Sequence, residues 1–196
     1  MALINVPIDS YDNFRSAVLA RAAQDLGYDV DGSYGYQCWD LAAELWMNMP
    51  EFAGQGLYPQ TGPLGYAREI WSISRIQNAG NSFDLITNFT DIKRGDVIVL
   101  DASWYFPVVG HVCYADQDYD PSAEEPNKLM CLGQNQDYEH SSPTVGYKPT
   151  LNLIPVQEMF LGAFRNKDWE VNPPIYRRKS NFPWVVVAKK LRNMKR

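Results

Sequence analysis

The chain has 196 residues, a length that fits one domain, or one domain with an appendage. Hydrophobic residues make up 45% of the chain and charged residues 21%, which is typical of globular proteins and excludes a disordered, collagen-like or coiled-coil chain. The formal net charge of −5 excludes a protein that binds nucleic acid through bulk charge attraction. The three cysteines are too few, and odd in number, for a disulfide scaffold.

The first half of the chain shows helical periodicity. Ser10 or Asp9 is placed to cap a first helix whose apolar residues fall on one face. A second helix is expected to begin at residues 37–38 and to stop at Pro50, which cannot continue it. After a loop rich in Gly and Pro, a third, short helix is expected over residues 67–77.

The second half of the chain is predicted to form strands. Five runs rich in apolar and β-branched residues are separated by polar or glycine-containing segments. In chain order they are VIVLD, VVGHVCYA, LMCLGQNQ, PVQEMFLGAF and PWVVVAKKL. Helices followed by strands indicate an α+β fold, rather than the alternating order of a parallel sheet.

No apolar run reaches the roughly 20 residues that a membrane-spanning helix requires. The N-terminus also lacks the basic and apolar regions of a secretory signal peptide. We therefore expect synthesis in a cytoplasm, no membrane span, and export by another route.

Basic residues gather at the C-terminal end. Residues 165–196 carry ten Lys or Arg against two Asp or Glu, while the rest of the chain carries eight against 21. A basic segment on an acidic body favours contact with an anionic polymer, and it is equally typical of a solvated terminal strand. Both interpretations remain open.

Cys38 lies where the second helix is expected to begin. The positive end of a helix dipole favours the thiolate form of a cysteine, which makes Cys38 a candidate nucleophile. Such a nucleophile needs a base. Of the two histidines, His140 lies in a polar turn and His111 in an apolar strand. His111 is therefore the expected general base and has to lie within hydrogen-bond reach of the sulfur.

A third group is expected to orient His111, and the run LMCLGQNQ supplies the candidates. Alternate residues of a strand share a face, and we expect Asn135 to continue that alternation, with Gln134 as the alternative. An amide that accepts a hydrogen bond from the imidazole Nδ1–H suffices for this role. Gln37 and the backbone N–H of Cys38 are the expected donors to the oxyanion.

The strand that carries His111 brings further candidates near the site. Cys113 shares a strand face with the histidine and remains a rival nucleophile, although no helix is expected to begin there. Cys113 and Cys131 are otherwise expected in the core as small apolar side chains. Three aromatic residues that closely precede the histidine are candidate substrate walls: Trp104, Tyr105 and Phe106.

A run of acidic residues just before Cys38 resembles a calcium-binding loop. It has carboxylates at loop positions 1, 3 and 12, and residues at positions 5 and 7 that can supply backbone oxygens. It departs from an EF-hand because position 6 is Tyr34 and position 12 is Asp rather than Glu. The spacing alone leaves Ca²⁺ and a plain polar turn open. The candidate ligands are Asp29, Asp31, Ser33, Gly35 and Asp40.

These motifs together resemble one known family. DxDGxxxxQCxD, then GD before a strand, then GHV, QN and FLGAFR are similar to the CHAP domains of phage endolysins and bacterial wall hydrolases. CHAP domains are cysteine- and histidine-dependent amidohydrolases or peptidases. The resemblance runs over residues 11–165, and the block over residues 29–40 is its most specific part.

The resemblance implies a papain-like α+β fold, with helices packed on an antiparallel sheet. It implies cleavage of peptidoglycan, either at the muramoyl–L-alanine amide or within the stem or cross-bridge peptide. On this sequence it implies Cys38 as nucleophile, His111 as base, and Asn135 as the Asn of the family's Glu-x-Asn segment. It also implies Ca²⁺ held by Asp29, Asp31 and Asp40, with backbone oxygens from Ser33 and Gly35.

We accordingly expect a catalytic domain over residues 1–165 and a basic extension over residues 166–196 that packs on the sheet or completes it. The expected partner is bacterial peptidoglycan, with anionic wall polymers as possible partners of the basic extension. A monomer is expected, with no nucleic-acid partner. It would act from the host cytoplasm on the wall after lysis, or from the virion.

One position departs from the family pattern: Gly133 stands where the family has Glu. The departure favours an alternative, a non-catalytic module that binds the wall or builds a phage tail. The retained cysteine and histidine favour a hydrolase. A cysteine peptidase acting on a protein substrate would use the same groove and is a third hypothesis.

Overall fold

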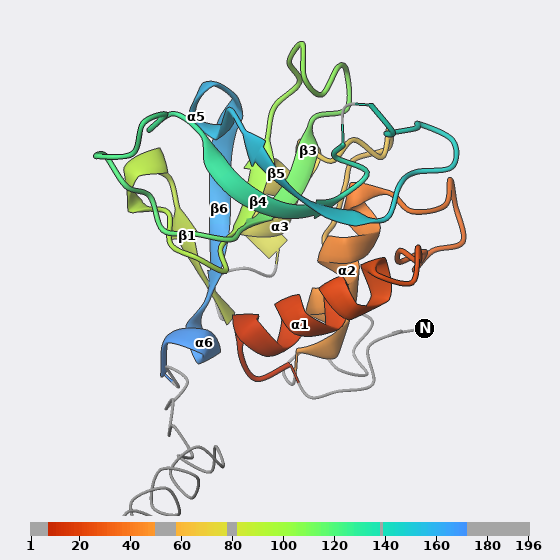
Figure 1. The fold of residues 1–196 in the computed structure, drawn as a ribbon, viewed down its shortest axis with the longest axis horizontal. Helices are drawn as coiled ribbons and strands as arrows, with labels where there is room; N and C mark the ends of the chain where they lie inside the picture. The colour runs from red at the N-terminus through yellow and green to blue at the C-terminus, as the bar shows by residue number, and fades with distance from the viewer. Residues whose placement is uncertain (1–7, 50–57, 78–81, 138, 172–196) are drawn as a thin grey trace, which may run out of the picture.

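The computed structural model describes residues 8–49, 58–77, 82–137 and 139–171 (Figure 1). The helices are α1 (Tyr11–Ala22), α2 (Cys38–Asn48), α3 (Glu69–Gln77), α5 (Val156–Met159) and α6 (Lys167–Val171), with a 3-10 turn, η1, over Phe89–Asp91. The strands are β1 (Phe83–Ile86), β2 (Val97–Leu100), β3 (His111–Ala115), β4 (Leu129–Gln134), β5 (Pro149–Ile154) and β6 (Phe160–Asn166). Within the described ranges, no helix has the length and apolar character to cross a membrane.

The six strands form one antiparallel sheet in the order β1-β6-β2-β3-β4-β5. Helix α2 packs against β3 and β4, and α1 against β5, so both helices cover the same side of the sheet (Figure 1). This arrangement confirms the predicted α+β fold. It also brings the start of α2 next to the start of β3, which is where the two chemically distinctive residues lie.

The central strands of the sheet are buried on both faces, which explains why their sequences are continuous apolar runs. In β2, Val97 and Val99 point into the core under the helices, while Ile98 and Leu100 point into a second apolar cluster on the other face. Cys113 and Cys131 are fully buried in that second cluster, as predicted for core cysteines.

Several element boundaries follow the predictions, and others differ. The Ser10 hydroxyl caps α1 by accepting from the Asn13 N–H at 3.3 Å. The run PVQEMFLGAF divides into a short helix, α5, and β6, because the buried Val156 and Met159 follow a helical spacing. Strands β1 and β5 were not predicted, since their polar and exposed positions hide the strand pattern. The run PWVVVAKKL lies outside the described residues.

Candidate active site

Cys38 is the first residue of α2 and is half-buried. The helix begins here because Gln37 is extended and its backbone N–H is accepted by the Asp40 carboxylate at 3.0 Å. Burial raises the pKa of the Cys38 thiol to about 12, while hydrogen bonds from the backbone N–H groups of Val112 and Trp39 act in the opposite direction. The expectation of a resting thiolate is therefore corrected: desolvation outweighs the helix N-terminus, and the sulfur rests as a thiol.

His111 is the first residue of β3, and its side chain is buried. Its ring stacks on Phe106, with 4.0 Å between ring centroids and 9° between planes, and this contact limits its rotation. Burial lowers the pKa of His111 to about 3, so the imidazole is neutral near pH 7. The backbone N–H of the next residue, Val112, meets the Cys38 sulfur, which fixes the strand against the helix.

A cavity of about 290 Å³ joins the predicted catalytic residues. Cys38, His111, Asn135 and Gln37 all line it, together with Tyr105 and Phe106 and with parts of residues 107–110 and 141–143. Trp104 does not line it: its side chain is 71% exposed and touches Tyr105 edge-on. The prediction of an aromatic wall therefore fits Tyr105, whereas Phe106 mainly supports the histidine ring.

The hydrogen-bond partner of the histidine differs from the prediction. His111 Nε2 lies 3.4 Å from Oε1 of Gln136, a residue that the sequence analysis did not select. Asn135 was expected there, but its backbone has φ 55°, which ends the strand alternation and turns its side chain away. The ring nitrogen involved is Nε2, rather than the Nδ1 that we had expected.

Asn135 and Gln37 instead bind each other. The Asn135 amide donates to Gln37 Oε1 at 2.7 Å and to the Ser142 carbonyl at 2.9 Å. The Gln37 amide donates to the Tyr34 carbonyl at 2.6 Å and to the Ser142 carbonyl at 3.3 Å. Both amide hydrogens of Gln37 are thus engaged, so the expectation that this side chain donates to an oxyanion is corrected. Its role is to hold the loop that precedes the nucleophile.

Gln134, the other candidate for orienting the histidine, also holds this loop. Its side chain is fully buried and accepts from the Tyr28 N–H at 2.7 Å. It donates to the carbonyls of Tyr28, at 2.7 Å, and Gln37, at 2.8 Å. One glutamine on β4 therefore anchors both ends of the loop over residues 28–37 to the sheet.

The predicted metal ligands converge in this loop. One carboxylate oxygen from each of Asp29, Asp31 and Asp40 lies within 4.8 Å of the other two. Asp40 is buried and accepts from the Val30 N–H at 2.7 Å, and burial raises its pKa to about 7. Three converging carboxylates, one of them desolvated, fit a hard, oxygen-bound cation such as Ca²⁺. The Gly35 carbonyl accepts from the Gln37 N–H at 3.0 Å and keeps one lone pair for such an ion.

Comparison with known proteins finds one relative in sequence and several in structure. No family model matches the chain. The D-alanyl-L-alanine endopeptidase of Streptococcus phage B30 is 29% identical over 147 residues, which are 73% of this chain and 28% of that protein. The crystal structure of endolysin LysIME-EF1 covers 80% of this chain with a TM-score of 0.58 and 23% identity. That of Ly7917 also covers 80%, with a TM-score of 0.54 and 18% identity.

The chain shares its fold with the solved structures of LysIME-EF1 and Ly7917. The resemblance that its motifs indicated is supported by a phage endopeptidase in sequence and by a solved endolysin in structure. The chain spans 28% of the phage relative and 64% and 62% of the two solved chains, so it corresponds to part of each.

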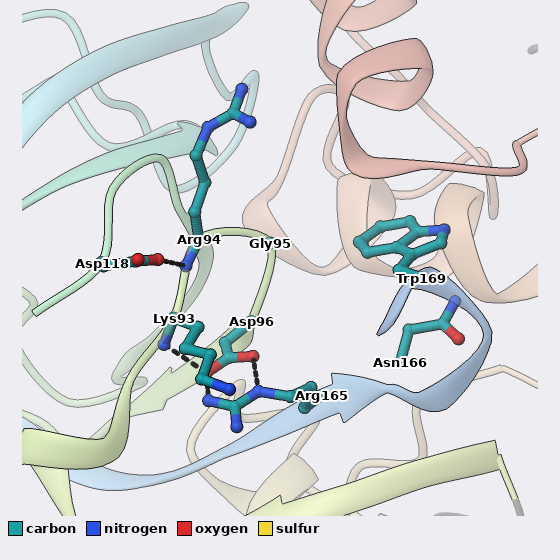
Figure 2. Close-up of a pocket in the computed structure, with 8 residues that line it drawn as sticks. All are labelled: Lys93, Arg94, Gly95, Asp96, Asp118, Arg165, Asn166 and Trp169. Carbon is teal, nitrogen blue, oxygen red and sulfur yellow. Dashed lines mark hydrogen bonds and ion pairs between the residues drawn. The ribbon is translucent and has the colours of Figure 1, made fainter. Parts of the chain in front are cut away.

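Two further motifs of the sequence are structural. They meet at a cavity of about 160 Å³ beside α6, shown in Figure 2. There Arg165 donates to the buried Asp96 at 2.9 and 2.8 Å, and the Lys93 N–H donates to the same carboxylate at 2.9 Å. The Arg94 N–H donates to Asp118 at 2.8 Å. The GD motif and the FLGAFR motif thus join β2 to β6, and they do so outside the cavity of Cys38.

Proposed function

We propose that this protein is a peptidoglycan hydrolase that cleaves an amide bond through Cys38 and His111. The observation that carries the proposal is the cavity lined by both residues, with the Val112 N–H on the sulfur. The endopeptidase activity named for the phage relative favours a peptide bond that involves D-alanine over the muramoyl amide. The endolysin fold supports the bacterial wall as the place of action.

The reaction begins from a neutral pair, since the thiol and the imidazole are both uncharged near pH 7. His111 takes the S–H proton as the sulfur attacks the carbonyl carbon, and the C=O electron pair moves onto the oxygen. The backbone N–H of Cys38, at the start of α2, is the donor that we assign to this oxyanion. The C–N bond then breaks, and the amine leaves with the proton from His111.

The same two side chains, Cys38 and His111, then take part in hydrolysis of the resulting thioester. His111 takes a proton from water as the water oxygen attacks the thioester carbon. The Cys38 sulfur then leaves and recovers that proton. Each group returns to its starting protonation state, so the cycle needs no further reactant.

A second cavity extends the site and supports an elongated substrate. It has a volume of about 490 Å³, and Gln37 lines both cavities. Its other walls include Trp39, Tyr58 and the exposed Tyr34. Aromatic faces and polar loop groups in both cavities suit a wall fragment that carries both sugar and peptide.

We further propose that Ca²⁺ binds at Asp29, Asp31 and Asp40, with backbone oxygens of Ser33 and Gly35. The ion would neutralise converging carboxylates and hold the loop in place. Asp40 also accepts from the Gln37 N–H. An ion that fixes Asp40 would therefore also fix Gln37, the residue before the proposed nucleophile. The role is therefore structural, and the chemistry remains with the cysteine and the histidine.

The test is digestion of purified peptidoglycan by the full chain and by Cys38→Ala, with products identified by mass spectrometry. We expect new free amines from the wild type and a loss of at least about 1,000-fold in rate for Cys38→Ala, since the nucleophile is removed. Product masses distinguish an endopeptidase from an amidase.

The matched control is Cys113→Ala, which removes the rival thiol. Cys113 is fully buried, so this variant is expected to retain activity with a modest loss of stability. A folded wild type that releases no products from several wall types would contradict the hydrolase and favour a wall-binding module. Loss of activity in Cys113→Ala, with Cys38→Ala active, would identify Cys113 rather than Cys38 as the nucleophile.

A further inference from the structure

The Gln136 side chain is held in one orientation. It is 1% exposed and lies just after β4. Its amide nitrogen donates to the Cys131 carbonyl at 2.9 Å and to the Thr150 carbonyl at 2.8 Å. Two carbonyl acceptors define which end of the amide is NH₂, because the opposite orientation would set oxygen against oxygen. The amide oxygen must therefore point toward His111.

This orientation decides the protonation of the imidazole. The Gln136 Oε1 atom is 3.4 Å from His111 Nε2, and an amide oxygen can only accept a hydrogen bond. The Nε2 atom of a neutral ring must then carry the hydrogen, which leaves Nδ1 with the lone pair. The stacking of Phe106 on the ring limits the rotation about Cβ–Cγ that would turn Nε2 away from Gln136. Only Nδ1 is then free to act as a base.

Gly133 provides the space that Gln136 occupies. A Cβ atom built on Gly133 would lie 2.2 Å from Gln136 Oε1 and 2.7 Å from its Cδ, and 3.0 Å from the Cβ of Cys113. Any larger residue at 133 would therefore displace the amide oxygen that meets the histidine.

We propose that Gln136 is a positioning residue that fixes His111 as its Nε2–H tautomer, with Nδ1 as the base, and that Gly133 is required because its missing side chain admits the glutamine. The role in catalysis rests on the proposed hydrolase function. The tautomer does not, because it is a property of the resting protein. The tautomer and the role in catalysis can therefore be contradicted independently of each other.

The first experiment records the imidazole ¹⁵N resonances of the full chain, labelled at histidine, at pH 7.5. With two histidines in the sequence, His140→Ala assigns both signals. We expect a protonated Nε2 and an unprotonated Nδ1 for His111. In Gln136→Met, which keeps the side-chain length without the amide, both resonances should move toward averaged values as the second tautomer appears. A wild-type Nδ1–H, or an unchanged tautomer in Gln136→Met, would overturn the proposal.

The second experiment separates positioning from packing. Gly133→Ala should displace the Gln136 amide and shift the His111 resonances, and Gly133→Ala with Gln136→Ala should regain stability without regaining the tautomer. Leu129→Ala, a buried residue of β4 away from the site, should lower the melting temperature yet leave both resonances unchanged. If Leu129→Ala shifts the tautomer as much as Gln136→Met does, the role of Gln136 is packing alone.

Wall digestion provides the catalytic readout. We expect Gln136→Met to lower kcat by about 10- to 100-fold with little change in KM, because a misprotonated base slows the reaction without removing substrate contacts. A tautomer shift with unchanged kcat would overturn the catalytic part. If the wild type itself does not cleave the wall, the hydrolase proposal fails while the resonances still test the tautomer.

Discussion

At the scale of single residues, the proposed catalytic pair, Cys38 and His111, is uncharged. Burial raises the pKa of Cys38 and lowers that of His111, so neither ionises near neutral pH. The neutral Gln136 amide orients the ring without adding a charge that would favour imidazolium. Proton transfer is therefore expected to accompany attack on the carbonyl rather than to precede substrate binding.

The burial of His111 predicts a loss of stability in acid. Its pKa is about 3 in the folded protein and about 6.5 when unfolded, so between these values the unfolded chain binds the extra proton. The free energy of unfolding should fall with decreasing pH, by up to about 1.4 kcal/mol per pH unit from this residue. Urea unfolding from pH 7 to pH 4 measures it, and His111→Phe should flatten the slope.

The exposed histidine is the control for that measurement. His140 is exposed and is the other histidine of the chain, so His140→Ala is the matched substitution with which the slope of stability against pH in His111→Phe is compared. If stability still falls with decreasing pH in His111→Phe, other titrating groups cause the loss of stability in acid.

Single residues also mark what the sequence could predict. Cys38 and His111 were selected because cysteine and histidine are rare here and carry distinctive chemistry, and the structure brings both to one cavity. Gln136 was missed because glutamine is common and its position depends on the positive φ of Asn135, which breaks the strand alternation. The φ values favoured by Asn offered a weak signal of that turn.

At the scale of elements, the loop over residues 28–37 is built onto the sheet rather than onto a helix. Gln134 anchors it from β4, and Tyr36 pairs with Gly146 in a parallel bridge. A Cβ at Gly146 would lie 2.0 Å from the Tyr36 carbonyl, so glycine permits this close approach. Cys38 thus lies between a packed helix and this loop, where the carboxylates of Asp29 and Asp31 from the loop and Asp40 from α2 converge.

Removal of calcium should therefore loosen the site. We expect a chelator to lower the melting temperature by roughly 5–10 °C and to reduce wall digestion, because an ion at 100 times its Kd contributes about 2.7 kcal/mol. Asp31→Asn should reproduce the effect, since Asp31 is an exposed member of the cluster. Calorimetry with Ca²⁺, Mg²⁺ and chelator measures it.

A matched control is Glu124→Gln, which removes an exposed carboxylate outside the cluster and should leave the response to calcium intact. A melting temperature that is independent of calcium in the wild type would contradict the proposed site.

The more completely a helix or strand is buried, the more clearly its sequence predicted it. The N-terminus of α2 and the strands β2, β3 and β4 carry continuous apolar runs or clear caps. Strand β5 alternates buried and exposed positions within six residues that include Pro, Thr and Asn, a composition that resembles a loop.

At the scale of the whole molecule, antiparallel pairing gathers a site from distant parts of the chain. Strands β3 and β4 are interior neighbours, and α2 crosses both of them. Cys38, His111 and Gln136 therefore meet although long segments separate them. The positions of these elements follow from the common apolar core rather than from any local signal.

The charge distribution of the whole chain predicts how the proposed hydrolase would bind the wall. Residues 172–196 carry eight Lys or Arg and no Asp or Glu. We expect neutralisation of three of them to weaken binding to walls that contain anionic polymers, most strongly at low salt, and to spare hydrolysis of a soluble wall peptide. Sedimentation with purified walls at two salt concentrations measures it. The variant is Arg177→Gln, Arg178→Gln and Lys179→Gln.

The control is Lys128→Gln, which removes a charge already paired with Glu125 on the acidic body. Equal losses in both variants would indicate a general charge effect rather than a contact made by the basic segment.

The close fit between Gly133 and Gln136 has a consequence for the evolution of this site. Neither residue can change alone without harm: a side chain at 133 collides with the glutamine, and loss of the glutamine leaves the histidine without its acceptor. A lineage that moves between this arrangement and one with an acidic residue at position 133 must therefore change both positions together. Across homologues, the two positions should vary as a pair.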